Sequence, residues 1–133
     1  MIKKDKILSN PRIIAIQKLY SNYLNRDTNL TFPKHRYKKF IKDVVKGTIE
    51  REELIQDLID KKLKENINNN KTDLMVKLMI MAAIYEFMFM HKTPVKVIIA
   101  EYLKVSDSFT EHSQKKFLNA ILDKASKISR ITM

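Results

Sequence analysis

An aromatic ring beside a row of lysines is the feature of this sequence best suited to binding chemistry. Read as a helix, segment 115–130 has an apolar stripe on one face, and Phe117 falls at the edge of that stripe. Lys116, Lys124 and Lys127 lie beside the ring. Such a ring can stack on an unpaired base while the ammonium groups bind phosphates. The alternative is a Phe at the edge of the core beside a solvated lysine face, and this helix alone favours that alternative.

The overall charge favours a polyanionic partner. The 133 residues include 26 Lys and Arg against 15 Asp and Glu, a formal net charge of +11. This is typical of nucleic-acid-binding proteins and, less often, of proteins that bind an anionic membrane surface. The basic residues form three groups: Lys3, Lys4, Lys6 and Arg12; Lys34, Arg36, Lys38, Lys39, Lys42 and Lys46; Lys115, Lys116, Lys124, Lys127 and Arg130. Only the last group includes an aromatic ring that is clearly available to a ligand. Solubility is therefore the favoured explanation for the basic residues of the second group.

Catalytic and metal-binding patterns are missing from the sequence. There is no cysteine, which excludes disulfides, thiolate ligands and a thiol nucleophile. His35, His91 and His112 lie on three different segments without acidic neighbours at metal-ligand spacing. The single glycine leaves no glycine-rich loop for nucleotide phosphates. We therefore expect a protein that is not an enzyme and needs neither cofactor nor metal.

The scarcity of glycine also predicts an all-α fold, because tight turns and hairpins need that residue. Apolar periodicity predicts helices over 11–25, 34–46, 49–66, 72–90, 94–107 and 111–130. In the second of these, Tyr37 is expected to face inward with the apolar side chains. The polar stretch 66–71 is the expected hinge. We predict one domain, a compact helical bundle of two small subdomains, with halves of about 1–68 and 69–133.

Three local signals refine these helices. Asn10-Pro11 and Thr93-Pro94 each resemble an N-cap residue followed by proline at the first helical position. Gly47 either ends the second helix or lets another helix pack closely against it.

No segment resembles a signal peptide or a membrane span. The N-terminus is charged and lacks an apolar core. The longest apolar run, 74–90, is interrupted by Lys77 and Glu86 and is short for a span, so it is better explained as a helix buried on most sides. We expect a soluble, cytoplasmic protein with no membrane partner.

Four stretches of the chain share their pattern with one known family. They are Arg-Ile-Ile-Ala-Ile-Gln-Lys-Leu-Tyr-Ser at 12–21, Ala-Ile-Tyr-Glu at 83–86, Thr-Pro-Val-Lys-Val-Ile-Ile-Ala-Glu at 93–101, and Lys-Phe-Leu-Asn-Ala-Ile-Leu-Asp-Lys at 116–124. Ser108-Phe109 precedes the last, and the two phenylalanines are eight residues apart, as they are in that family. The whole chain thus resembles, in order, the NusB family of transcription antitermination factors.

The resemblance implies an all-helical fold and a defined RNA ligand. Members bind the boxA element, a single-stranded part of ribosomal RNA transcripts, with the ribosomal protein that doubles as NusE, inside the RNA polymerase antitermination complex. The positions that match the family's RNA contacts are Lys3, Lys4, Lys6, Arg12, Lys116 and Phe117, and the lysine row adds Lys124. The NusE contact is expected near Tyr85 and Glu86.

The chain departs from the family pattern in its central helix and closing motif. Val76 and Met81 stand where charged residues are usual, and Ala120 replaces a signature glycine. Two alternatives therefore stay open. One is an RNA-docking module with a different protein partner, and the other is a self-associating scaffold, a homodimer whose interface is the apolar central helix.

Overall fold

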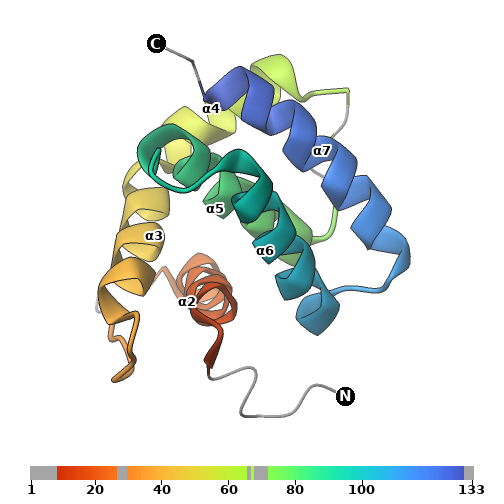
Figure 1. Ribbon diagram of the computed structural model, residues 1–133. Coiled ribbons are helices and arrows are strands. Elements are labelled where there is room, and N and C mark those ends of the chain that lie inside the picture. Colours follow the sequence, from red (N-terminus) through yellow and green to blue (C-terminus); the bar gives the residue numbers. More distant parts are fainter. Residues whose placement is uncertain (1–8, 27–29, 66, 68–71, 131–133) are drawn as a thin grey trace.

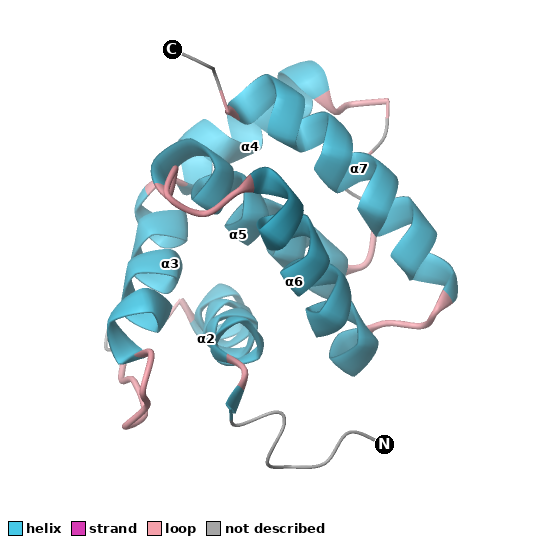
Figure 2. Ribbon diagram, in the orientation of Figure 1, coloured by secondary structure: helices cyan, strands magenta, loops and turns pink. Residues whose placement is uncertain are grey.

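A computed structural model of the chain describes residues 9–26, 30–65, 67 and 72–130. Its described part contains α-helices and no strand, so the predicted all-α fold is confirmed (Figure 2). The helices are α2 Pro11–Asn25, α3 Lys38–Glu50, α4 Glu52–Lys62, α5 Leu74–Phe89, α6 Val95–Phe109 and α7 Ser113–Ser129.

Helix α5 lies at the centre of the molecule and contacts each of the other five helices that the structure describes (Figure 1). Every side chain from Leu78 to Phe87 is buried, as is Val76. A helix with neighbours on all sides needs no polar face, which explains the apolar run in the sequence. The apolar character that suggested a homodimer interface is therefore accounted for by packing within the chain.

The N-terminal helices pack directly on the C-terminal ones. Helix α2 contacts α3, α5 and α6, and α7 contacts both α5 and α6. Of the predicted hinge at 66–71, only Ile67 lies within the described residues, and its side chain is buried. The division into two halves stays a prediction. None of the described helices is both long and apolar enough to cross a bilayer.

Helix α3 differs most from the sequence-based expectation. It begins at Lys38 instead of residue 34, and it continues past Gly47 to Glu50. The ring of Tyr85 rests directly on Gly47, where an added Cβ would collide with it. Of the two roles considered for this glycine, the structure shows the close approach of a neighbouring helix.

The two proline-associated caps have different outcomes. The Oδ1 atom of Asn10 accepts hydrogen bonds from the amides of Arg12 at 3.0 Å and Ile13 at 3.4 Å, which confirms the predicted cap of α2. At α6 the prediction is wrong: Pro94 itself is the N-cap residue and no side chain caps the helix.

Candidate nucleic-acid interface

Helix α7 carries the predicted apolar stripe and packs with it against α5 and α6. Leu118, Ile121, Leu122 and Ala125 are all buried in the core. Phe117 is partly buried and packs against the edge of the same core. The sequence-based position of this ring, at the border of the apolar face, is thus confirmed.

Beside this border runs a stripe of residues spaced three or four apart, so that they share one side of α7. We call it the α7 stripe; it consists of Ser113, Lys116, Phe117, Ala120 and Lys124. All except Phe117 are exposed. The methyl group of Ala120, which replaces the signature glycine, therefore faces solvent. No bulky side chain of the stripe stands between the Phe117 ring and Lys124.

The lysines of α7 differ in their partners. The Nζ atom of Lys115 lies 3.1 Å from a carboxylate oxygen of Asp107, and that of Lys127 lies 3.1 Å from one of Asp123. Lys116 forms no ion pair with any described residue, and it borders a groove between α6 and α7 together with Leu103 and Asn119. Positive charge is thus most available next to Phe117.

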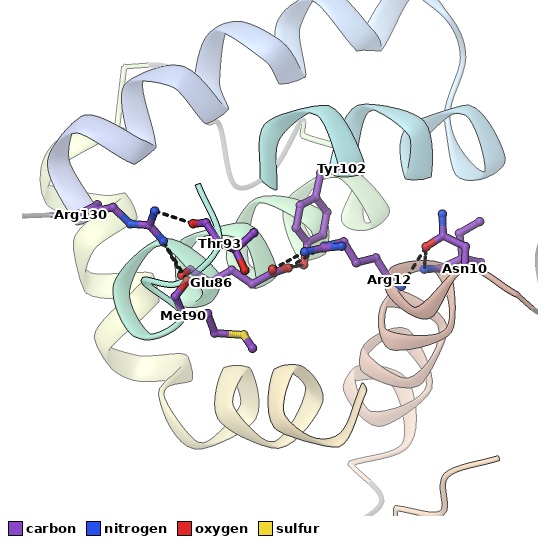
Figure 3. A network of polar contacts seen from close by, with 8 residues as sticks. Asn10, Arg12, Glu86, Met90, Thr93, Tyr102 and Arg130 are labelled. Carbon is purple, nitrogen blue, oxygen red and sulfur yellow. Dashed lines mark hydrogen bonds and ion pairs between the residues drawn. The ribbon is translucent and has the colours of Figure 1, made fainter. Parts of the chain in front are cut away.

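Arg12 lies in the interior, where it is paired with Glu86. Its Nε and Nη2 atoms donate to the two carboxylate oxygens of Glu86 at 3.0 and 2.6 Å (Figure 3). The hydroxyl of Tyr102 donates to the same carboxylate at 2.5 Å, and the guanidinium lies 4.7 Å from the ring centroid of Phe40. These contacts join α2, α5 and α6 through one fully buried carboxylate.

Burial and pairing set the protonation states of this network. Burial lowers the pKa of Arg12, but the hydrogen bond and charge of Glu86 more than compensate, and the pKa lies above its usual value. Burial and the nearby Glu86 carboxylate raise the pKa of Tyr102 well above 10.0. A direct contact of Arg12 with RNA, or of Glu86 with a protein partner, would require this buried ion pair to open, at a cost of about 3–5 kcal/mol.

Arg130 forms a second interior contact that the sequence gave no reason to expect. Its guanidinium donates to the backbone carbonyl oxygens of Thr93 at 2.8 Å, Glu86 at 3.1 Å and Met90 at 3.2 Å (Figure 3). It also donates to that of Phe87 at 2.9 Å. The last carbonyls of a helix have no partner within the helix. Arg130 therefore caps the end of α5 from the end of α7 and is not part of the exposed basic surface.

Tyr85, the other predicted partner contact, is mostly buried but lies beneath an exposed surface. Its ring centroid is 5.3 Å from that of Phe89, a residue with 42% of its surface exposed. The guanidinium of Arg51 lies 4.3 Å from the Phe89 ring and 5.7 Å from the Tyr85 ring. The sequence did not indicate Phe89 or Arg51, because they meet only when the α3–α4 corner packs on the end of α5.

The remaining predicted site residues are distributed as follows. Lys3, Lys4 and Lys6 lie outside the described residues. Lys116, Phe117 and Lys124 share the α7 stripe, whereas Arg12 is buried away from it. Among the residues that the structure describes, no cluster of histidine and acidic side chains could hold a metal ion.

Together these features define an all-helical domain whose exposed basic edge carries an aromatic ring. A sequence-family model, that of the NusB family, matches residues 9–127. The chain belongs to the NusB family. This is a family of transcription antitermination factors and not of enzymes, in agreement with the expectation from the sequence.

Curated relatives carry the same family name. The chain is 27% identical over 89 residues to "Transcription antitermination protein NusB" of Mesorhizobium japonicum, which covers 67% of this chain and 57% of that protein. It is 28% identical over 88 residues to the protein of that name from Agrobacterium fabrum, covering 66% and 53%. The chain thus matches little more than half the length of these relatives. No solved structure matches it.

Proposed function

We propose that this protein is a transcription antitermination factor that binds single-stranded, boxA-type RNA through the α7 stripe. The observation that carries the proposal is the position of Phe117, partly buried at the border of the core with the exposed Lys116 beside it. Membership of the NusB family and the names of its relatives support the same role. The lysines at positions 3, 4 and 6 would add phosphate contacts from the start of the chain.

The geometry of the α7 stripe suits a single strand. A base stacks on Phe117, while Lys116 holds a phosphate next to it. Lys124 lies seven residues after Phe117, which is two turns or about 10 Å along the helix. There it can hold a second phosphate. Ala120 between them presents only a methyl group, so a sugar can approach the helix closely. Sequence preference would come from the edges of unstacked bases, as is usual for single-stranded RNA.

A surface at the end of α5 supports the proposed partnership with NusE. Phe89, Tyr85 and Arg51 form one aromatic and cationic patch, and such residues are enriched at the energetic centres of protein interfaces. Glu86 would act beneath this patch by holding α5 in place through Arg12. We infer that NusE binds here and that the pair acts in the cytoplasm within the RNA polymerase antitermination complex.

Fluorescence anisotropy of a labelled boxA RNA, with and without NusE, tests both surfaces. Phe117→Ala should weaken RNA binding about tenfold or more in both conditions, because it removes a stacking contact. Phe89→Ala, a matched loss of a partly exposed ring, should leave binding of RNA alone unchanged and reduce the gain in affinity from NusE. RNA binding that is insensitive to Phe117→Ala would contradict the proposed RNA surface. An unchanged NusE effect in Phe89→Ala would contradict the proposed partner surface.

A further inference from the structure

A second basic segment with an exposed aromatic ring lies on a different side of the molecule. Residues 34–42, Lys-His-Arg-Tyr-Lys-Lys-Phe-Ile-Lys, include no acidic residue. The sequence predicted a helix from residue 34 with Tyr37 facing inward, and this prediction is wrong. The chain is irregular until α3 begins at Lys38, and 47% of the surface of Tyr37 is exposed. The sequence-based prediction left this basic segment without an exposed aromatic ring. In the structure, Tyr37 supplies one.

Local contacts hold the Tyr37 ring in place. The backbone amide of Tyr37 donates to Nδ1 of His35 at 2.9 Å. The two ring centroids are 6.0 Å apart, and the guanidinium of Arg36 lies 5.4 Å from the Tyr37 centroid. A ring ordered in this way loses little conformational entropy when a base stacks on it.

The same segment forms one wall of a groove against α2. Lys34, His35 and Phe32 line it from the loop, and Lys18 lines it from α2. Lys38 and Lys39 follow at the start of α3, where the first turn has no acidic residue. Among the residues that the structure describes, Lys39 is the one of these lysines that pairs with an acid: its Nζ atom lies 3.1 Å from a carboxylate oxygen of Asp43, and its side chain is highly exposed. The groove thus combines positive charge from two elements, and the Tyr37 ring lies next to it, 6.0 Å from the ring of the groove residue His35.

We propose that this groove, with Tyr37, is a second binding site for the same single-stranded RNA. Phosphates lie along Lys18, Lys34 and Lys38, and one base stacks on Tyr37. The site rests on the proposed function and extends it. The groove is lined by α2 and the loop before α3, whereas the α7 stripe belongs to a helix that packs on α5 and α6 (Figure 1). The groove therefore takes nucleotides that flank those bound by α7.

An RNA strand fits these observations better than a membrane surface. Interfacial membrane binding needs an apolar face of several side chains. Within residues 34–42, Tyr37 is the one exposed large hydrophobic side chain, and cations surround it. A single ring flanked by positive charges in a groove is the arrangement used for stacking and backbone contacts on single strands.

The test compares a short boxA RNA with the same RNA extended on both sides. Tyr37→Ala should leave the affinity for the short RNA within twofold and weaken binding of the long RNA at least fivefold. The double variant Lys34→Gln/Lys38→Gln should lower the slope of log affinity against log salt by roughly 1.4 on the long RNA only, about 0.7 for each phosphate contact.

Matched controls are present in the chain. Tyr23→Ala removes another exposed tyrosine under an arginine, with Arg26 at 5.0 Å from its ring, but next to Glu52 instead of a basic segment. Lys104→Gln removes an exposed lysine of α6. Neither should change the affinity for the long RNA. Circular dichroism checks that each variant is folded.

The outcomes separate this site from the α7 stripe. Loss of long-RNA affinity in Tyr37→Ala supports the groove even if Phe117→Ala has no effect, which would contradict only the α7 proposal. A long-RNA affinity unchanged in both the Tyr37 and the lysine variants overturns the groove, while Phe117→Ala can still support α7. Binding to phosphatidylglycerol vesicles that depends on Tyr37, with RNA binding unaffected, also overturns it. A wild-type protein that binds neither RNA contradicts both proposals.

Discussion

The interior network around Glu86 and the α7 stripe use similar groups for opposite purposes. Both place cations beside aromatic rings, and both fall within motifs that resemble the NusB family. In the interior, the planar fork of Arg12 meets a carboxylate with two hydrogen bonds, and no part of Glu86 is exposed. On α7, the exposed ammonium of Lys116 has no described ion-pair partner. Burial thus distinguishes the cation–aromatic group that stabilises the fold from the one that is available to a ligand.

The largest effect on stability is expected when the buried cation is removed. Arg12→Ala leaves the Glu86 carboxylate buried without its partner, and we expect the free energy of unfolding to fall by about 3–5 kcal/mol. Urea denaturation followed by circular dichroism measures this loss. The double variant Arg12→Met/Glu86→Leu serves as the control and should recover much of the stability, because no charge is then left unpaired. A loss below about 1 kcal/mol in Arg12→Ala would contradict the assigned interior role.

A smaller loss is expected when the cap of α5 is removed. Arg130→Ala deprives four carbonyl oxygens of a charged donor, and we expect a destabilisation of about 2 kcal/mol or more. Arg130→Lys should restore little of it, since an ammonium group lacks the planar fork that reaches several carbonyls at once. Thermal unfolding of the two variants measures the difference. Full rescue by lysine would show that charge alone matters at this position.

Alkaline pH offers a graded test of the same interior. The pKa of Tyr102 is raised in the folded protein, so its contribution to stability is fully present below about pH 10, the value in the unfolded chain. Above that pH the unfolded chain loses the proton first, and stability falls by at most about 1.4 kcal/mol per pH unit from this residue. Tyr102→Phe should be less stable at pH 8 and should lose less stability between pH 10 and 11. If the free energy of unfolding falls equally with pH in the wild type and in Tyr102→Phe, Tyr102 is not the cause of the alkaline loss of stability.

The smallest effect on stability is expected on the exposed side. Lys116→Gln should change the free energy of unfolding by less than about 0.5 kcal/mol, as is usual for exposed sites. It should lower the salt dependence of boxA RNA binding by roughly 0.7 in the log–log slope. Titrations at several salt concentrations measure that slope. A marked loss of stability together with an unchanged slope would show that Lys116 resembles the interior cations after all.

Local signals predicted much of this molecule. The bounds of α2, the cap by Asn10, the burial of α5 and the apolar stripe of α7 all follow from spacing within one segment. The sequence also placed Phe117 at the border of the core, because that position depends only on the periodicity of its own helix.

The predictions that failed concern residues whose environment depends on a distant segment. Tyr37 was expected to be buried, but the helix begins after it and 47% of its surface is exposed. Thr93 was expected to cap α6, but the helix begins at Val95 with Pro94 as its N-cap residue, and the backbone carbonyl oxygen of Thr93 accepts a hydrogen bond from Arg130. In each case the periodicity of one segment carried no information about which other segment would pack against it.

The sequence by itself determined an all-helical chain, a basic surface, and the family to which its motifs point. Only the tertiary structure decided which cations face solvent. Arg12 and Glu86 are 74 residues apart, and Arg130 and Phe87 are 43 residues apart. Charge is a property of each residue, but the free energy of a charge depends on its solvation and on its partner. Those are fixed only when distant helices meet, which is why some of the basic residues hold the fold together and others remain exposed to solvent.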